Sequence, residues 1–238
     1  MSYMSLPVQL PLSVQLRDDA TFANFFGGPN DALVNLLDMD RKLPSVDTEQ
    51  FIFIYGNNGV GCSHLLQAAC HQVDRQAGRS IYLPMSELVN YSPQLLEGME
   101  RLQLVCIDDI GEVAGIPEWE EGLFDLFNRL RDAKTRLLVA ASKPPKSLGI
   151  QLPDLVSRLS WGLVFQVQPL TDHDKVSALQ LRAHLRGLEM SEEVARYIIY
   201  RSSREMGSLF QILHKLDGAS LRAKRKLTIP FVKQVMGW

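Results

Sequence analysis

A glycine-rich segment with a hydroxyl residue is the first feature of this sequence that could do chemistry. Residues 56–63 read GNNGVGCS and lie between an apolar run and a helical pattern, which is the context of a phosphate-binding loop. Glycines let backbone N–H groups curl around phosphates, and the start of a helix adds positive potential. A turn that binds nothing is the alternative, and the order strand, loop, helix and hydroxyl argues against it. The predicted nucleotide contacts are Gly56, Asn58, Gly59, Val60, Gly61, Cys62, Ser63 and His64.

The lysine that such a loop normally carries is absent, and Cys62 stands in its place. Its loss removes a point charge directed at the β- and γ-phosphates, so binding and turnover of a triphosphate should both suffer. A cysteine at a helix N-terminus can have a lowered pKa. We favour the interpretation that Cys62 is an inert small side chain.

An apolar run over residues 104–107 ends in two acids, Asp108 and Asp109, as the second half of a nucleotide site would. Asp108 would hold Mg²⁺ through water, together with the hydroxyl of Ser63. Asp109 stands where a water-activating acid usually lies. An acidic turn is the alternative, but behind a phosphate loop the pair indicates a site for a magnesium nucleotide.

Alternating strands and helices must position these groups. We predict a parallel sheet flanked by helices, with ligands at the carboxyl ends of its strands. After Pro169 only helical patterns follow, and Thr171 with Asp174 resembles a capping box. We therefore expect a tail over 1–20, an α/β nucleotide-binding domain over 21–168 and a helical lid over 169–238. The predicted strands are 51–55, 80–83, 102–107, 136–141 and 163–167. The first predicted helix follows the glycine-rich loop and ends near Gly78. The other predicted helices are 118–133, 171–186, 191–202, 206–224 and 229–236, the last starting after Thr228.

Composition excludes several classes of protein. The formal net charge of −2 argues against a dedicated duplex-DNA binder, so we expect DNA contact to be indirect or weak. The basic cluster at 222–226 is better explained as the complement of a helix dipole. Three irregularly spaced cysteines suit reduced thiols, no signal peptide is evident, and no apolar run reaches the ~20 residues of a membrane span. We expect a cytoplasmic protein.

The sequence resembles the DnaA/Hda family of AAA+ proteins over nearly its whole length. The matching segments include 19–25 (DATFANF), 61–69, the acidic strand end, 152–162 (LPDLVSRLSWG), 204–206 (REM) and 225–233 (RKLTIPFVK). The likeness is closer to the regulators of this family, which promote hydrolysis of the ATP held by DnaA, than to the initiators. An initiator would continue into a helix-turn-helix domain, whereas this sequence ends at Trp238.

The resemblance implies roles for further residues. Arg158 matches the arginine finger, which acts in trans, although spacing alone would leave it a surface arginine at a helix end. Residues 9–14 resemble a motif that binds the sliding clamp, with Gln9 at a pocket rim and Leu10 and Leu12 in apolar pockets. Phe22 and Phe25 would line the region of the nucleotide base.

Two sensor positions differ in how well they match. Ser142 lies at the position of the first sensor. At the second, Gly207 replaces the expected arginine, and Arg204 lies one turn earlier. With the lysine also absent, two cations are missing near the γ-phosphate, so we expect ADP with Mg²⁺ and feeble intrinsic hydrolysis.

The resemblance therefore implies an ADP-bound adaptor that restrains initiation of DNA replication. It would link the DNA-loaded sliding clamp, the β subunit of DNA polymerase III, to ATP-loaded DnaA and stimulate hydrolysis there. Because AAA+ modules associate through the nucleotide interface, the sequence is compatible with a homodimer and does not fix the oligomeric state. The alternatives are a helicase loader or another genuine ATPase, and a metabolic P-loop kinase. Both would need the missing lysine.

Overall fold

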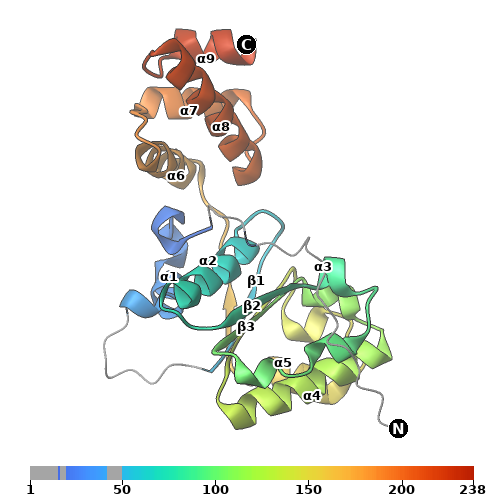
Figure 1. Ribbon diagram of the computed structural model, residues 1–238. Coiled ribbons are helices and arrows are strands. Elements are labelled where there is room, and N and C mark those ends of the chain that lie inside the picture. The colour runs from blue at the N-terminus through green and yellow to red at the C-terminus, as the bar shows by residue number, and fades with distance from the viewer. Residues whose placement is uncertain (1–15, 17–19, 42–49) are drawn as a thin grey trace.

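A parallel sheet forms the centre of the molecule (Figure 1). The computed structural model describes residues 16, 20–41 and 50–238. Within them, five strands lie in the order β2-β3-β4-β1-β5, and every neighbouring pair is parallel. The strands are β1 (Phe51–Tyr55), β2 (Ser80–Pro84), β3 (Leu104–Asp108), β4 (Arg136–Ala141) and β5 (Leu163–Gln166).

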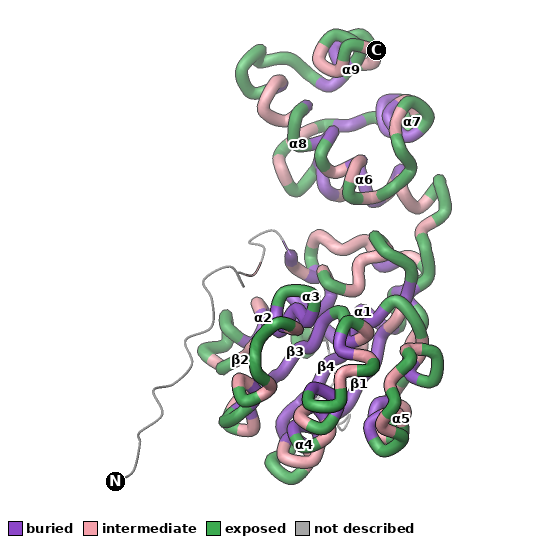
Figure 2. The backbone as a smooth tube through the Cα atoms, turned by 90° about the vertical axis from the view of Figure 1, so that its right-hand side faces the viewer, coloured by how far each residue is buried: buried purple, intermediate pink, exposed green. Residues whose placement is uncertain are grey.

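Helices cover both faces of the sheet, which explains why its central strands are apolar on both sides. Ile52 and Ile54 belong to one apolar cluster with helices α1 (Asp31–Leu37) and α2 (Cys62–Arg75). Phe51 and Phe53 point the other way, into a cluster with α3 (Met85–Leu88), α4 (Pro117–Ala133) and α5 (Pro153–Leu159). Figure 2 shows the resulting buried layer along β1, β3 and β4.

The C-terminal part is a helical lid with an apolar core of its own (Figure 1). Thr171 and Asp174 form the predicted capping box at the start of the lid, and Thr228 caps its last helix by accepting from the Phe231 N–H at 3.4 Å. The lid helices are α6 (Asp172–Leu185), α7 (Glu192–Arg201), α8 (Met206–Ala223) and α9 (Ile229–Met236).

The predicted elements are confirmed, with shifts of a few residues at their ends. The third strand starts at Leu104 rather than at residue 102, because residues 99–101 form a 3-10 turn that holds Leu102 outside the sheet. No range was predicted for α1, α3 or α5, since four to seven residues are too few to display a helical period, and α5 was expected only as a helix end at Arg158. None of the described helices has both the length and the apolar character needed to cross a bilayer.

Candidate functional site

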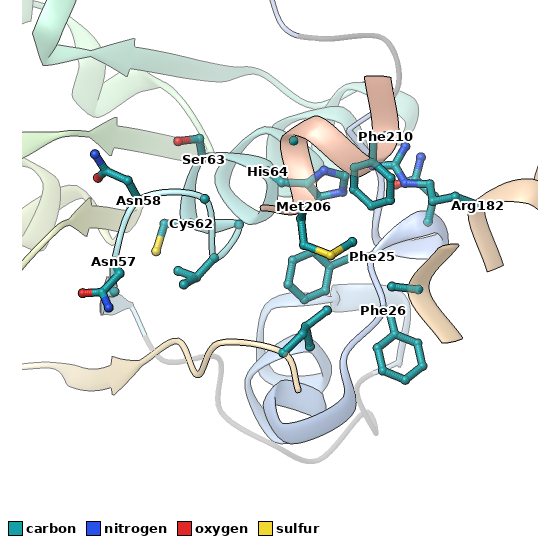
Figure 3. A pocket seen from close by; sticks show the side chains of 18 of the residues that line it. Phe25, Phe26, Asn57, Asn58, Cys62, Ser63, His64, Arg182, Met206 and Phe210 are labelled. Carbon is teal, nitrogen blue, oxygen red and sulfur yellow. The ribbon is translucent and has the colours of Figure 1, made fainter. Parts of the chain in front are cut away.

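A cavity of about 1100 Å³ lies between the carboxyl ends of the strands and the lid (Figure 3). Its walls come from six segments that lie far apart in the sequence: the turn after Phe22–Asn24, the loop after β1, the end of β3, the end of β4, and lid helices α6 and α8. A cavity of this size accommodates a ligand as large as a nucleotide. The wall residues that matter most here are Phe25, Phe26, Gly56 to His64, Asp108, Asp109, Ser142, Arg182, Arg186, Met206, Gly207, Phe210, His214 and Lys215.

The loop after β1 fits a phosphate group. Gly59 and Gly61 have φ angles of +83° and +107°, which L side chains rarely adopt. A Cβ atom at Gly61 would also come within 2.7 Å of the Phe25 ring. Helix α2 then begins at Cys62 without a side-chain cap, so the N–H groups of its first turn are open to an anion in the cavity.

Cys62 holds its proton firmly. Burial, together with the nearby carboxylates of Asp108 and Asp109, raises the pKa of its thiol to about 12. The thiol is therefore neutral near pH 7, which agrees with the inert interpretation. The same two carboxylates make this side of the cavity negative, and the first turn of α2 holds no compensating lysine.

Asp108 and Asp109 differ in their surroundings although they are adjacent. Asp108 is buried, and its carboxylate accepts a hydrogen bond of 2.6 Å from the Tyr82 hydroxyl and one of 3.0 Å from the Asp109 N–H. Asp109 is exposed in a left-handed conformation with φ 52°. Partial desolvation, then the charges of Asp108 and Glu112, raise the pKa of its carboxyl.

Tyr82 is a site residue that the sequence analysis missed. Burial and the charge of Asp108 raise the pKa of its phenol, so the hydroxyl stays protonated and donates to Asp108. Tyr82 is the third residue of β2, and β2 pairs with the strand that carries Asp108. An alternating position on a neighbouring strand was the signal that could have found it.

A magnesium ion would need ligands from outside the protein. Within the described residues, no group of three or more histidine, cysteine or acidic side chains is placed to hold a metal. Ser63 and Asp108 both line the cavity, so they fit a Mg²⁺ ion that takes its remaining oxygens from phosphates and water.

The other predicted loop and base contacts divide between the cavity and the core. The His64 ring nitrogen lies 2.9 Å from the Thr21 carbonyl oxygen, and its ring is 5.4 Å from that of Phe25, so His64 ties α2 to the N-terminal turn. Phe25 and Phe26 line the cavity. Phe22 is only 4% exposed and belongs to the apolar cluster beneath the sheet, with Leu33.

The lid supplies cations that the sequence analysis did not identify. Arg182 packs its guanidinium 4.5 Å from the centre of the Phe210 ring, and Arg186 lies 3.9 Å from the Asp217 carboxylate. Arg182 lies on α6 and Arg186 is the C-cap of that helix, one turn later, whereas His214 and Lys215 come from α8. A search for consecutive basic residues misses such a group, but the i, i+4 spacing on α6 could have indicated it.

The two sensor positions also reach this cavity. Ser142 follows β4 directly and is exposed in the cavity wall. Gly207 lies in the first turn of α8, and among the described residues no heavy atom comes within 4 Å of a Cβ built there.

Arg158 lies away from this cavity. It is half-buried in the last turn of α5, and it lines a small crevice together with Phe51, the first residue of β1. The clamp-motif residues Gln9, Leu10 and Leu12 lie outside the described residues. In the basic cluster, Lys226 pairs with Glu189 at 2.8 Å and Arg225 packs on the Phe231 ring at 5.1 Å.

Comparison with solved structures relates the fold to replication proteins. Domain III of the replication initiation protein DnaA from Thermotoga maritima is similar with a TM-score of 0.72 and 22% identity, over 94% of this chain and 98% of that one. AMPPCP-bound DnaA from Aquifex aeolicus gives 0.68 and 23%, over 88% and 69%. A variant of the Thermotoga maritima Holliday-junction motor RuvB gives 0.64 and 15%, over 91% and 73%. These likenesses establish the fold.

Family models cover almost the whole described chain. Residues 16–166 match the bacterial DnaA ATPase domain, and residues 172–236 match the lid domain of Hda. The first match takes in the phosphate loop, both acids and Arg158, and the second takes in all four lid helices. This chain belongs to the Hda/DnaA family of AAA+ proteins.

Proposed function

We propose that the cavity binds ADP with Mg²⁺. The left-handed glycines, the uncapped start of α2 and the position of Ser63 and Asp108 in one wall support a nucleotide whose phosphates lie at the loop. The Aquifex DnaA of the same fold holds AMPPCP, a triphosphate analogue. Cys62 and Gly207 leave this chain without two cations near the position of a γ-phosphate, so a diphosphate fits its charge better.

Arg158, in this proposal, acts on ATP held by DnaA rather than on this chain's own nucleotide. The observation that carries it is that Arg158 lies beside Phe51, at one end of β1, whereas the phosphate loop follows Tyr55 at the other end. At about 3.3 Å per residue the strand separates them by roughly 13 Å or more, which is beyond the reach of one side chain. A planar guanidinium can donate two hydrogen bonds to phosphate oxygens of a neighbouring subunit.

The remaining parts complete an adaptor. Gln9, Leu10 and Leu12, in a tail over 1–20, would dock on the DNA-loaded β sliding clamp. An AAA+ body over 21–168 and a lid over 169–238 would pack against DnaA, with the bound nucleotide setting their relative angle. Hydrolysis on DnaA would follow in the cytoplasm, and further initiation would stop. A homodimer that covers Arg158 is the inactive form that this proposal allows.

The test follows hydrolysis of labelled ATP preloaded on DnaA, with DNA-loaded clamp and either the native protein or Arg158→Ala. The native protein should accelerate hydrolysis, and Arg158→Ala should remove about a thousandfold of any finger-dependent acceleration. Omission of the clamp should weaken the effect of the native protein.

The matched control is Arg201→Ala, which removes an exposed arginine at the end of α7 and should act like the native protein. Equal rates of hydrolysis with the native protein and with Arg158→Ala would refute the role of Arg158 as an arginine finger. Turnover of ATP by this protein alone would favour a genuine ATPase instead.

A further inference from the structure

Trp161 packs on the core of the protein and lies next to Arg158. Its side chain is 57% exposed, which is unusual for a tryptophan that packs on a core. One side of the ring meets the stacked pair Phe51 and Phe127, at centroid distances of 6.0 and 6.4 Å. The guanidinium carbon of Arg158 lies 5.5 Å from its ring centre. A line of aromatic rings therefore runs from the sheet to the arginine.

Gly162 fixes the position of this tryptophan. A Cβ atom at residue 162 would clash with the carbonyl oxygen of Phe51, so the backbone after Trp161 packs directly on β1. The next residue, Leu163, pairs with Ile52 in the sheet. Trp161 is thus held by its own backbone as well as by its ring contacts.

The other end of α5 is held by a buried acid. Glu120 is 2% exposed, and its carboxylate accepts hydrogen bonds from the backbone N–H groups of Gly115 at 2.7 Å, Gln151 at 3.0 Å and Leu152 at 2.7 Å. Leu152 is the N-cap of α5. A buried carboxylate bound by several N–H groups holds the loop that starts this helix in one place.

Helix α4 supplies a contact at each end of α5: Glu120 binds the loop that starts α5, and Phe127 packs against Trp161 after its end. Glu120 and Phe127 are seven residues apart, which is two turns, so they lie on one face of the helix that packs along α5 (Figure 1). Helix α5 has only seven residues and would not be stable alone. Besides its buried residues Leu155 and Leu159, these two contacts fix its direction, and hence the starting point of the Arg158 side chain.

The contact with Trp161 leaves Arg158 ready to bind an anion. Among the described residues, Arg158 forms no ion pair. A guanidinium beside an aromatic ring keeps the N–H groups that point away from the ring available as donors. The side chain also loses less freedom on binding, because its contact with the Trp161 ring already restricts it.

We propose that Trp161 is a positioning residue for Arg158, and that Glu120 anchors the opposite end of α5 for the same purpose. This inference rests on the proposed function, in which Arg158 meets the phosphates of ATP on DnaA. The pair holds the arginine in the orientation that the partner's nucleotide requires, before the partner arrives.

Single-turnover hydrolysis on ATP-loaded DnaA, measured against the concentration of this protein, tests the inference. Trp161→Ala should lower the saturating rate about tenfold while the half-saturating concentration changes less than about twofold. Trp161→Phe should restore most of the rate, because it keeps an aromatic face. Glu120→Gln should lower the rate too, whereas its exposed neighbour Glu121→Gln should not.

A rise in the half-saturating concentration with an unchanged saturating rate would overturn the inference, since Trp161 would then be a contact to DnaA. A second measurement needs no DnaA. In the full-length protein, the NMR signal of the Arg158 Nε–H should carry the ring-current shift of Trp161. It should move to the position of a solvated arginine in Trp161→Ala and part of the way in Trp161→Phe.

An Arg158 signal that is the same in Trp161→Ala would also overturn the inference. Failure of the proposed function looks different: native protein and Arg158→Ala would be equal in hydrolysis, while the NMR signal would still depend on Trp161.

Discussion

Cys62 and Gly207 each stand where a family resemblance leads one to expect a cation, and the surroundings of each would favour one. A side chain at Gly207 would enter open space among the described residues. An ammonium group at residue 62 would lie beside the carboxylates of Asp108 and Asp109, which would stabilise it. The missing charges are therefore a property of these two residues, not a consequence of the packing around them.

Restoring the cations should change which nucleotide is preferred. In Cys62→Lys and in Gly207→Arg, affinity for ATP relative to ADP should rise about tenfold each, because a cation gains more from the additional γ-phosphate charge. Calorimetric titration with both nucleotides measures the ratio. Cys62→Met and Gly207→Gln are the neutral controls of similar length, and a ratio that moves equally in them would contradict the electrostatic explanation.

The Cys62 thiol should be slow to react. Its pKa of about 12, against an ordinary 9.0, leaves roughly a thousandfold less thiolate at any pH below 9, and the thiolate is the nucleophile. Iodoacetamide labelling at pH 8, followed on the Cys62 peptide by mass spectrometry, should thus be far slower than in the unfolded chain. Asp108→Asn should speed labelling, since it removes the largest charge effect. Labelling within tenfold of the unfolded rate would show the thiol to be unprotected.

Among individual site residues, the sequence predicted those that belong to a contiguous motif. Residues 56–63 and the two acids line one cavity. This was predictable, because a phosphate loop and an acidic strand end are both local motifs. Three residues were missed because no motif connects their elements to the loop: Tyr82 on β2 donates to Asp108, and Arg182 on α6 and Arg186 at its C-cap line the cavity. Only the tertiary fold brings them together.

Helix α1 is too short to be stable alone, and Arg136 fastens it to the sheet. The guanidinium of Arg136, at the start of β4, donates to the carbonyl oxygens of Leu36 at 3.2 Å and Leu37 at 3.4 Å, in the last turn of the helix. These are carbonyls that a helix cannot satisfy by itself. Burial lowers the pKa of Arg136, so the contact is made at a cost in desolvation.

Arg136→Met should therefore lower the free energy of unfolding by about 1–3 kcal/mol, because buried carbonyls lose their donor. Urea titration followed by circular dichroism measures this difference. Arg79→Met, which changes an exposed arginine ahead of β2, is the control and should stay within about 0.5 kcal/mol of the native protein. An equal effect of both variants would mean that the cap contributes nothing.

The helices and strands that sequence patterns predicted are those long or apolar enough to display a period. β1 and β4 are buried runs, and the lid helices run for eight to eighteen residues, with side-chain caps at the start of α6, α7 and α9. No range was predicted for helices α1 and α5, since each is held by contacts from elsewhere, by Arg136 in one case and by Glu120 in the other. Tertiary contacts that stabilise a short helix leave no local signal.

In the whole molecule, the cavity lies between two separately built parts. The sheet and its helices bury two apolar clusters, the lid buries a third, and none of the three shares a residue with another. Residues 167–171 link the parts, and α6 also contacts the turn at Phe22–Asn24. The wall of the cavity is drawn from both, with Cys62 on one side and Arg182 on the other.

Separate cores have a consequence for heat denaturation. Without a ligand, each part can melt at its own temperature, so the van't Hoff enthalpy should fall below the calorimetric enthalpy. A nucleotide that touches both walls binds only when both parts are folded, so at a hundredfold excess over its Kd it adds about 2.7 kcal/mol to their joint stability. Scanning calorimetry with ADP should show one sharper transition and an enthalpy ratio near one. A ratio of one in the absence of nucleotide would mean that lid and sheet already melt as a single body.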